Sequence, residues 1–561
     1  AGDLAMSRAP GRLDGLADLA VRWGVPTFVA LLVIANAAGG LMPGVGYWDT
    51  GEFQTVLPLL GTAHPTGYPT YVLLGYVANL VLTPLGEPAF RINVLSLLCV
   101  AAAAAVAVAL VRRLTGSTIL GIAAGIGLAL TPVVWTHATS ADPHPLHLAF
   151  VAILLFVLVT WGEKHRRGDA HADRWLVVAA VVFGLSMGNH SLTLLLAIPV
   201  GLFVLATEPR IVLRGRFVLT CAIALVLTVT LVYLELPIRA GLLPAPIVYA
   251  SPDTWSGFWY IALAEQFRGS LVDPLGSLGT KAGDVADLAS QQFGLLAILI
   301  VPGFLATIRY APRYALLTGT AMVITLVFNA SYINADISRY YLGPVLWAWT
   351  WLAMLGAFVV RELGWLLGPR DSATDAGLRE PASDPEDAGG TAPAGAGIPT
   401  PGPSIRAWAP AAVAVVVAAA LLAPSVIASP STRILADQSG NTDAASWTSE
   451  TFAAVAQDAV IVSWWATSTP MWYAQKVEGQ RPDVFIVDDR TMLDLDLGGA
   501  TDVIGRYLGQ RPVYVIRANP GDLGLVLKLY DLQVVLTPDG VPIGNGSTQL
   551  FQVVGTRPVN G

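Results

Sequence analysis

Acidic and imidazole side chains gather in one short segment near the start of the chain. Asp49 and Glu52 lie three residues apart in the run YWDTGEF, and His64 follows in a turn rich in Gly and Pro. A carboxylate beside a membrane can act as a general base, because partial desolvation raises its proton affinity. The same spacing also fits a capping box, with Asp49 at a helix N-cap and Glu52 in the first turn. Spacing alone leaves both interpretations open.

Two histidines, His64 and His190, could ligate a metal, pack in a core or donate hydrogen bonds to an anion. Neither has a cysteine or a second histidine at ligand spacing, so no metal site is predicted. Asn189 and His190 close one end of a predicted crossing and can reach the same pocket as the first loop. We therefore expect both histidines to donate to an anionic ligand.

Three arginines, Arg239, Arg268 and Arg339, stand within or beside aromatic and apolar sequence. A guanidinium binds phosphate oxygens in pairs and stays charged at low dielectric, so three of them suit a phosphate head group held at a membrane. The alternative for any one arginine is an ion pair with Glu265 or Asp336, or contact with lipid phosphates. For all three together, that alternative is the weaker one.

The C-terminal part of the chain holds two further pairs of candidate residues. Trp464 and Trp465 are expected to pack against their surroundings. Asp488 and Asp489 end a predicted strand, which is a common ligand position in α/β folds, and a turn cap explains them equally well.

The composition places these residues on a membrane protein. Of 561 residues, 54% are hydrophobic and only 13% are charged, and the mean hydropathy is +0.61, which excludes an ordinary water-soluble enzyme. The formal net charge of -7 argues against a nucleic-acid-binding protein. Cys99 and Cys221 both lie in apolar runs, so neither a disulfide framework nor a cysteine zinc site is expected.

Apolar runs predict about eleven transmembrane helices, because each crossing needs roughly 20 apolar residues. They are residues 24–42, 92–111, 118–135, 146–161, 175–189, 191–207, 217–236, 293–308, 314–330, 341–360 and 407–428. Residues 69–85 are nearly long enough, but Pro69 and Pro84 bound the run and Asn79 interrupts it. This segment is expected to lie at, or dip into, the outer membrane interface.

The distribution of basic residues predicts the orientation. If residues 69–85 do not span the membrane, the loops on one side of the membrane carry eighteen Arg and Lys residues and the loops on the other side carry five. The basic side is the cytoplasmic side, so the N-terminus is expected in the cytoplasm and the acidic, histidine and arginine clusters outside. No cleavable signal peptide is predicted, because the first apolar run is long enough to span.

These patterns divide the chain into five parts. They are a cytoplasmic N-terminus (1–23), a transmembrane module (24–365), a disordered cytoplasmic linker rich in Pro, Gly and Ala (366–405), a last crossing (406–428) and an outer domain (429–561). In the outer domain, β-rich runs from Ala459, Asp483, Pro512, Leu532 and Leu550 alternate with helix-length segments. Strands separated by helices predict a small α/β domain with a partly parallel sheet.

The motifs WDTGEF, GTAHPTGYPTY, FRINVLS, MGNHSLT and LPIRA occur in this order between residues 48 and 240. Together they resemble a bacterial family of protein O-mannosyltransferase-like membrane proteins, relatives of the eukaryotic transmembrane O-mannosyltransferases in the GT-C glycosyltransferase superfamily. The resemblance extends over about residues 25–345. Family members usually have Asp-Ser-Gly-Glu and His-Pro-Pro-Gly, so Thr50 and Thr66 depart from the pattern, as does Asp142 where a Glu is usual.

The resemblance implies a polytopic GT-C-like fold and an inverting transfer of a sugar, with mannose the expected one. The donor would be a polyprenyl-phosphate sugar and the acceptor a Ser or Thr of a protein, on the outer face of a bacterial inner membrane. Asp49 would be the general base and Glu52 its supporting carboxylate, although the sequence does not decide which of the two is the base.

Further site residues complete this expectation. The donor phosphate would bind Arg239, Arg268, Arg339, His64 and His190, and the candidate substrate-binding residues are Tyr68, Arg91, Asp142 and Asn189. No metal or other cofactor is expected, because the arginines can supply the charge that a cation gives elsewhere.

Two other functions stay open on sequence grounds. A transporter or flippase of lipid-linked sugars would use the same outward arginines, but alternating access predicts polar residues in mid-helix or internal repeats. The sequence shows neither. A non-catalytic scaffold would leave the carboxylates of WDTGE without a role.

Overall fold

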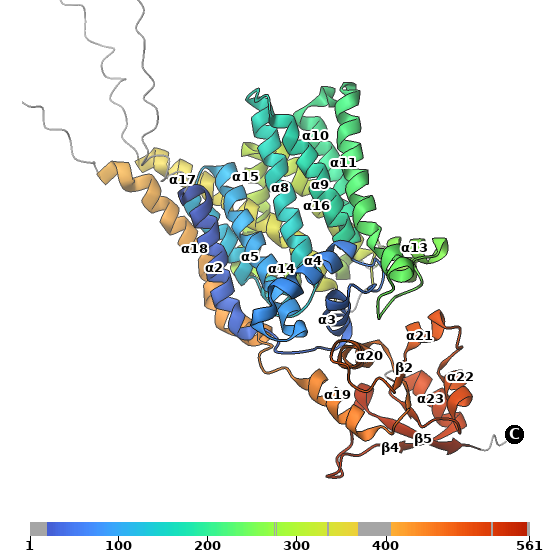
Figure 1. Cartoon of the computed structure of the whole chain (residues 1–561). Helices are drawn as coiled ribbons and strands as arrows, with labels where there is room; N and C mark the ends of the chain where they lie inside the picture. The colour runs from blue at the N-terminus through green and yellow to red at the C-terminus, as the bar shows by residue number, and fades with distance from the viewer. Residues whose placement is uncertain are drawn as a thin grey trace, which may run out of the picture.

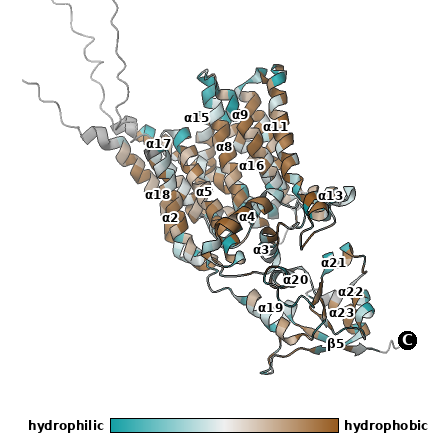
Figure 2. Ribbon diagram, in the orientation of Figure 1, coloured by the Kyte–Doolittle hydropathy of each residue, from teal (hydrophilic) through white to brown (hydrophobic). Residues whose placement is uncertain are grey.

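A helical bundle and a smaller α/β domain make up the molecule. The computed structural model describes residues 20–273, 275–276, 278–333, 336–367, 405–517 and 520–557. The α/β domain lies at one end of the bundle (Figure 1). Hydrophobic residues dominate the bundle helices, whereas the α/β domain is mixed in character (Figure 2).

Helices α2 to α18 form the bundle and its connecting segments. Their bounds are α2 Val25–Ala37, α3 Trp48–Leu59, α4 Pro69–Val81, α5 Pro88–Thr115, α6 Thr118–Leu130, α7 Pro132–Thr136, α8 His144–Arg166, α9 Ala172–Asn189, α10 Ala197–Thr207, α11 Gly215–Tyr233, α12 Glu235–Pro237, α13 Trp255–Ala262, α14 Leu278–Phe293, α15 Ile300–Tyr310, α16 Pro312–Ala330, α17 Leu342–Leu367 and α18 Ile405–Ala436. Three short 3-10 segments also concern the site, namely η4 Ser191–Leu196, η7 Glu265–Ser270 and η9 Ile337–Tyr341.

Several of these helices can cross a membrane. Among the described residues, eight helical stretches are long and apolar enough: Arg22–Gly40, Pro88–Thr115, His144–Arg166, Gly215–Leu242, Gly279–Tyr310, Pro312–Ala330, Ile337–Leu363 and Pro410–Ala436. Shorter apolar helices cover Pro69–Val81, Thr118–Leu130 and Ser191–Thr207. The predicted membrane-embedded helical fold is confirmed, and the number of eleven crossings stays a prediction.

The short helix α4 corresponds to the segment predicted to lie at the interface. Its 13 residues span about 20 Å at 1.5 Å per residue, which is less than the roughly 30 Å of a bilayer core. It begins at Pro69, where the missing N–H of proline is tolerated. It contacts α3 at the end of the bundle that faces the α/β domain (Figure 1).

Small residues allow the central helices to pack closely. A Cβ on Gly121 or Gly125 of α6 would lie 2.7 Å from the backbone oxygen of Val108 or Ala104, respectively, in α5. Glycine is therefore required at this four-residue spacing for the backbones of α5 and α6 to approach each other. The surrounding core is apolar and is built mainly from α5, α6, α8 and α17.

The C-terminal domain contains one five-stranded sheet. Its strands are β1 Val460–Val462, β2 Phe485–Val487, β3 Val513–Val515, β4 Tyr530–Val534 and β5 Phe551–Thr556, in the order β2-β1-β3-β5-β4. Strands β2, β1 and β3 are parallel, and β5 pairs antiparallel with both β3 and β4. The helices are α19 Asp443–Ala454, α20 Trp465–Trp472, α21 Asp489–Asp494, α22 Ala500–Tyr507 and α23 Pro520–Leu529. The predicted α/β domain with a partly parallel sheet is confirmed.

One hydrophobic core continues from the bundle into the α/β domain. Phe53 and Leu57 of α3 and Tyr71 of α4 belong to the same buried cluster as Ile461 of β1 and Met471 of α20. The α/β domain is therefore packed against the first loop and α3, and its contact with the bundle is part of the folded core.

One predicted boundary, the junction of the last crossing with the outer domain, differs from the structure. The predicted last crossing, 406–428, is part of α18, which continues to Ala436, so the α/β domain begins several residues after residue 429. The helix continues because Ile427, Ile434 and Leu435 extend its exposed apolar surface. The predicted linker, 366–405, and the predicted N-terminal part, 1–23, lie almost entirely outside the described residues.

Candidate active site

Helix α3 carries both acidic residues of the first loop. It begins at Trp48, with Tyr47 as an N-cap residue that makes no side-chain cap bond. Asp49 therefore lies in the first turn of the helix, and the capping box with Asp49 at the N-cap is wrong. The physical reason is that the chain is extended at Tyr47 and turns into the helix at Trp48, which leaves the carboxylate of Asp49 free for contacts with other segments.

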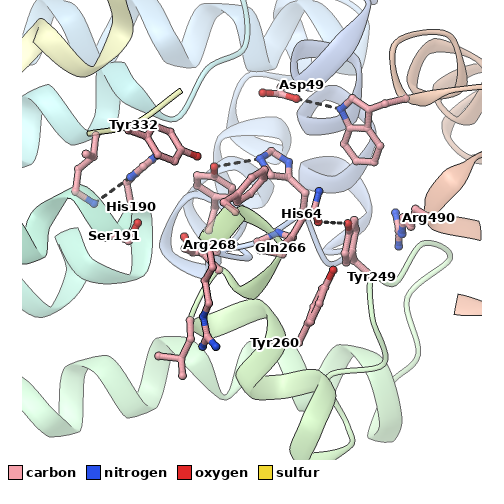
Figure 3. A pocket seen from close by; sticks show the side chains of 18 of the residues that line it. Asp49, His64, His190, Ser191, Tyr249, Tyr260, Gln266, Arg268, Tyr332 and Arg490 are labelled. Atoms are coloured by element: carbon pink, nitrogen blue, oxygen red, sulfur yellow. Dashed lines mark hydrogen bonds between the residues drawn. The ribbon is translucent and has the colours of Figure 1, made fainter. Parts of the chain in front are cut away.

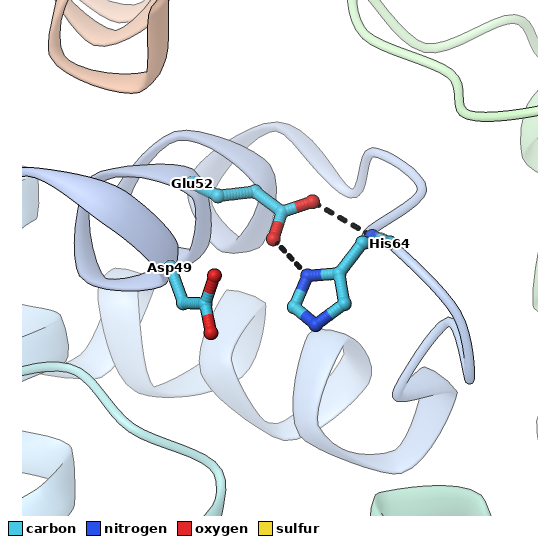
Figure 4. Close-up of side chains that lie close together, drawn as sticks. All are labelled: Asp49, Glu52 and His64. Carbon is cyan, nitrogen blue, oxygen red and sulfur yellow. Dashed lines mark hydrogen bonds and ion pairs between the residues drawn. The ribbon is translucent and has the colours of Figure 1, made fainter. Parts of the chain in front are cut away.

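Glu52 and His64 form a buried pair beside Asp49 (Figure 4). One carboxylate oxygen of Glu52, Oε1, accepts a hydrogen bond of 2.7 Å from the backbone N–H of His64, and Oε2 pairs with His64 Nδ1. The other ring nitrogen, Nε2, lies 3.1 Å from the hydroxyl of Tyr68. Glu52 is fully buried, so its carboxylate holds the turn that carries His64.

The carboxylate of Asp49 is held by two donors from distant parts of the chain. Trp465 Nε1 donates to Oδ1 at 3.0 Å, and an amino group of Arg339 donates to Oδ2 at 3.3 Å. Burial tends to raise the pKa of Asp49, but His64, Arg339 and Trp465 outweigh it and bring this pKa below its ordinary value. For His64, burial lowers the pKa, and Glu52 and Asp49 raise it above the ordinary value. The carboxylate and the imidazole therefore each favour the charged form of the other.

A cavity of about 710 Å³ opens at this carboxylate (Figure 3). Its polar lining includes Asp49, His64, Tyr68, His144, His190, Arg268, Arg339, Asp488, Asp489 and Arg490. Its apolar lining includes Leu192, Leu263, Phe267, Leu271 and Phe328. Bundle, loops and α/β domain all contribute to these walls, so the cavity exists only when both parts of the molecule are folded together.

Four of the five residues predicted to bind the donor phosphate line this cavity. They are His64, His190, Arg268 and Arg339. Arg268 is largely exposed and lies 3.9 Å from Glu265. Arg239 is not part of the lining: its guanidinium donates to the backbone oxygens of Leu59 and Leu60, at 3.2 and 2.9 Å. The reason is that α3 ends here with unpaired carbonyl groups, which a guanidinium satisfies.

Of the four predicted substrate-binding residues, Tyr68 lines the cavity. Asn189 is buried and donates to the oxygen of Pro143 at 3.1 Å. Arg91 donates to Gly86 and Asn79, between α4 and α5. Neither Asn189 nor Arg91 reaches the cavity, because each satisfies a backbone carbonyl of its own neighbourhood.

Asp142 lies behind the cavity wall and pairs with two histidines. Its Oδ1 is 2.6 Å from Nδ1 of His144, and its Oδ2 is 2.9 Å from Nδ1 of His137. Burial tends to raise the pKa of Asp142, but the two histidines bring it well below its ordinary value. Asp142 therefore acts on the cavity through His144, which lines it and stacks on Tyr340 at 5.4 Å.

Sequence reasoning missed several residues of the site. His144 is not among the residues that the sequence predicts for the site, and Trp465 is predicted only to pack. Packing alone is wrong for Trp465, because its N–H reaches Asp49. Arg490 lies over the ring of Tyr249 at 4.3 Å and donates to the oxygen of Val248, which ties α21 to the loop before α13. The signal that could have found Trp465 and Arg490 is their position directly after parallel strands β1 and β2, where ligands of α/β sheets lie.

Asp49, Glu52 and His64 could together hold a metal ion. One ligand atom from each lies within 4.8 Å of the others. However, both oxygens of Glu52 already accept hydrogen bonds from His64, and the guanidinium of Arg339 already lies against Asp49. A cation at this position would displace those contacts and meet the charge of Arg339.

Comparison with known proteins identifies the segment that carries these residues. The family description "Protein O-mannosyl-transferase TMEM260 N-terminal domain" matches residues 49–212. This segment is therefore similar to TMEM260-type N-terminal domains. It includes Asp49, Glu52, His64, His144 and His190. The resemblance to O-mannosyltransferase-like GT-C proteins is therefore confirmed.

Two relatives carry the same name. Protein O-mannosyl-transferase TMEM260 of Mus musculus is 34% identical over 215 residues, which cover 37% of this chain and 29% of the mouse protein. The Dictyostelium discoideum protein is 22% identical over 233 residues, covering 40% of this chain and 28% of its own length. The chain thus spans less than a third of the length of either relative.

The fold extends beyond this domain. The crystal structure of ArnT from Cupriavidus metallidurans bound to undecaprenyl phosphate superposes with a TM-score of 0.54. The alignment covers 94% of this chain and 97% of ArnT, at 13% sequence identity. The likeness includes both the bundle and the α/β domain, and the predicted GT-C-like fold is confirmed.

Proposed function

We propose that the chain is a membrane glycosyltransferase that transfers a sugar from a polyprenyl-phosphate donor to Ser or Thr hydroxyl groups of a protein. Mannose is the expected sugar, because both relatives of the TMEM260-type domain are named protein O-mannosyl-transferases. The lipid phosphate is supported by ArnT, which has the same fold and binds undecaprenyl phosphate. The observation that carries the proposal is the cavity in which the carboxylate of Asp49 lies beside Arg339, with Arg268 and His190 in the same walls.

Asp49 is the proposed general base of a single inverting displacement. It takes the proton from the acceptor hydroxyl while the hydroxyl oxygen forms a bond to the anomeric carbon of the sugar. The bond between this carbon and the phosphate oxygen breaks, and polyprenyl phosphate leaves with the electron pair. The lowered pKa of Asp49 keeps the carboxylate in its proton-accepting form at neutral pH. Glu52 is buried and occupied by His64, which favours Asp49 over Glu52 as the base.

The leaving phosphate gains negative charge, and the cavity supplies positive charge and donors to stabilise it. Arg339 and Arg268 are the cationic candidates, and both line the cavity. His190 accepts a hydrogen bond at Nδ1 from the backbone N–H of Leu192. In a neutral ring the proton is then on Nε2, and His190 is a donor for a phosphate oxygen.

The apolar walls suit the first isoprenyl units of a lipid donor. Leu192 and Tyr340 line both the main cavity and a smaller adjoining one, whose other walls include Val151, Leu196 and Trp347. The apolar lining thus continues from the main cavity into the bundle. We propose that the active site faces the extracytoplasmic side of a bacterial inner membrane, where a lipid-linked donor replaces the nucleotide sugars of the cytoplasm.

No metal is required in this proposal. Arg339 and His64 supply the positive charge beside Asp49 that a divalent cation would otherwise give. Transfer is therefore expected to continue in the presence of EDTA, and restoration of activity by added Mn²⁺ or Mg²⁺ after chelation would contradict this part of the proposal.

The proposed function is tested with purified full-length protein, mannosyl-phosphoryl-polyprenol and a Ser/Thr-containing peptide. Glycopeptide is measured by mass spectrometry. Asp49→Asn should lower kcat by about 10³-fold, because it removes the base. Glu52→Gln should keep more activity than Asp49→Asn and should lower the melting temperature, because Glu52 holds the turn of His64.

The outcomes separate the competing functions. Glycopeptide formation by Asp49→Asn at the wild-type rate would exclude Asp49 as the base. Movement of unmodified lipid-linked sugar across vesicles by the same variant, with no glycopeptide from wild type, would support a flippase. If Asp49→Asn keeps its transfer activity and Glu52→Gln loses it while remaining folded, the base is Glu52.

A further inference from the structure

The α/β domain reaches directly into the proposed active site. Trp465 is the first residue of α20 and follows β1 at the carboxyl end of the parallel strands. Its indole N–H donates to Oδ1 of Asp49 at 3.0 Å (Figure 3). The partner oxygen, Oδ2, faces Arg339. Each oxygen of the carboxylate is thus directed by one donor, and one of the two donors comes from the C-terminal domain.

The residue before Asp49 is held by the same segment of the α/β domain. Trp48 has φ +58°, a left-handed conformation that is rare for bulky residues and is kept only where the surroundings enforce it. Its ring meets the ring of Trp464 edge to face at 4.8 Å. Trp464 is in turn anchored by a hydrogen bond of 3.0 Å from its Nε1 to the oxygen of Ser547.

Close packing of α3 on α20 completes this contact. A Cβ on Gly51 would lie 2.8 Å from Oγ1 of Thr469 and would also clash with the oxygen of Gly46. Glycine at position 51 therefore lets the first turn of α3 rest on α20. The direction of the Asp49 side chain depends on this contact, because Asp49 belongs to the same helical turn.

We propose that Trp465 is a positioning residue for the proposed base, and that the α/β domain completes the active site by directing the carboxylate of Asp49. This inference rests on the proposed function, since it assigns a task to Trp465 only if Asp49 accepts the proton. In it, the indole N–H fixes the oxygen Oδ1, so that the carboxylate presents a defined lone pair to the acceptor hydroxyl.

The N–H of Trp465 can be separated from the packing of its ring. The ring makes edge-to-face contacts with His64 at 5.8 Å and with Trp472 at 5.7 Å. Phenylalanine can make such contacts without an N–H. Removal of the N–H also removes one of the groups that lower the pKa of Asp49, so this pKa should rise.

Trp465→Phe in the full-length protein tests the proposal. Loss of a hydrogen bond to a charged group should lower kcat by about 10-fold, with little change in KM for the lipid donor. In a plot of kcat against pH, the acid limb should move to higher pH. Trp465→His, which keeps a ring N–H, should recover part of the lost kcat.

Trp447→Phe is the matched control. Trp447 lies in α19 of the same domain and donates its Nε1 N–H to the oxygen of Thr548 at 3.0 Å. This variant loses one indole hydrogen bond without touching Asp49, so its kcat profile should keep the acid limb of wild type. Thermal unfolding of every variant reports whether the fold is retained.

The outcomes distinguish this inference from the proposed function. If Asp49→Asn is as active as wild type, the proposed function fails and the inference fails with it. If Asp49→Asn is inactive and Trp465→Phe has the kcat and the acid limb of wild type, only the inference is overturned. A Trp465→His variant no more active than Trp465→Phe also contradicts it. If Trp465→Phe does not fold, the test rests on Trp465→His. A folded Trp465→His variant whose pH profile of kcat has the wild-type acid limb supports the inference. A shifted acid limb in this variant overturns it.

Discussion

At the scale of single residues, the site depends on charges that stabilise one another. His64, Arg339 and Trp465 favour the charged form of Asp49 and outweigh its burial, and Glu52 and Asp49 favour the cation of His64 and outweigh its burial. Each of these shifts is also a contribution to stability, since the folded protein binds protons differently from the unfolded chain.

The sign of each contribution follows from the direction of the shift. The pKa of Asp49 is lowered from 3.8, so its contribution is present above this value and is lost as the pH falls through the folded pKa. The pKa of His64 is raised from 6.5, so its contribution is complete below this value and is lost as the pH rises through the folded pKa. Both contributions are present between these two values.

The difference in melting temperature between wild type and His64→Gln should therefore be largest near about pH 5 and should decrease toward about pH 9. Thermal unfolding in detergent over this range measures it. His171→Gln is the control, because His171 is exposed and lies away from the cavity. A difference between wild type and His64→Gln that stays constant over the whole range would contradict the charged pair.

The individual residues differ in how far the sequence could predict them. Asp49, His64 and Tyr68 were predictable because they lie within 20 residues of one another in motifs rich in Gly and Pro. Trp465 was not, because it contacts Asp49 across 416 positions of the chain and a tryptophan in a strand-rich segment most often packs. Arg239 was predicted to bind the donor phosphate, and this prediction was wrong. An arginine near a membrane can equally well donate hydrogen bonds to the unpaired carbonyl groups at the end of a helix.

At the scale of elements, the contact of α3 with α20 is the one on which the site depends. Gly51→Ala should force these helices apart and lower the free energy of unfolding by about 2 kcal/mol, in the range expected for overpacking. It should also lower kcat, because Asp49 lies in the same helical turn. Melting temperature and transfer rate are measured on the same preparations.

Gly201→Ala is the control for this substitution. Gly201 lies in α10, and a Cβ there would meet nothing within 4 Å, so the melting temperature should be unchanged or slightly raised. Equal destabilisation by both substitutions would mean that the α3–α20 contact is not tightly packed.

The elements themselves were largely predictable. Apolar runs of crossing length became helices, and all five β-rich runs became strands of one sheet. Helix ends were less predictable: α18 continues past residue 428 to Ala436, and α3 begins at Trp48. Apolar character continues past residue 428 in the first case, and the start of α3 depends on a backbone conformation that spacing does not reveal.

At the scale of the whole molecule, the α/β domain and the proposed active site lie at the same end of the bundle, and the loop between α8 and α9 lies at the other end (Figure 1). The loop between α8 and α9 belongs to the set of loops with eighteen Arg and Lys residues, which predicts that the latter end is cytoplasmic. The two ends can be distinguished by chemical labelling.

Single cysteines are introduced into a background with Cys99→Ala and Cys221→Ala. Asp539→Cys, at an exposed position of the α/β domain, should react with a membrane-impermeant maleimide in intact spheroplasts. Arg167→Cys, at an exposed position of the loop after α8, should react only after permeabilisation. The reverse pattern would place the proposed active site in the cytoplasm and would require a different donor.

The sequence by itself determined that this is a polytopic membrane protein with an α/β domain, and that its first loop carries a carboxylate and a histidine. Hydropathy and periodicity are local properties, so a linear chain displays them. Only the tertiary structure decided that Trp465, Arg339 and Asp49 meet, that Arg239 caps a helix, and that the α/β domain forms a wall of the cavity. Such contacts join segments hundreds of residues apart, and they arise from the packing of a shared core that no local pattern specifies.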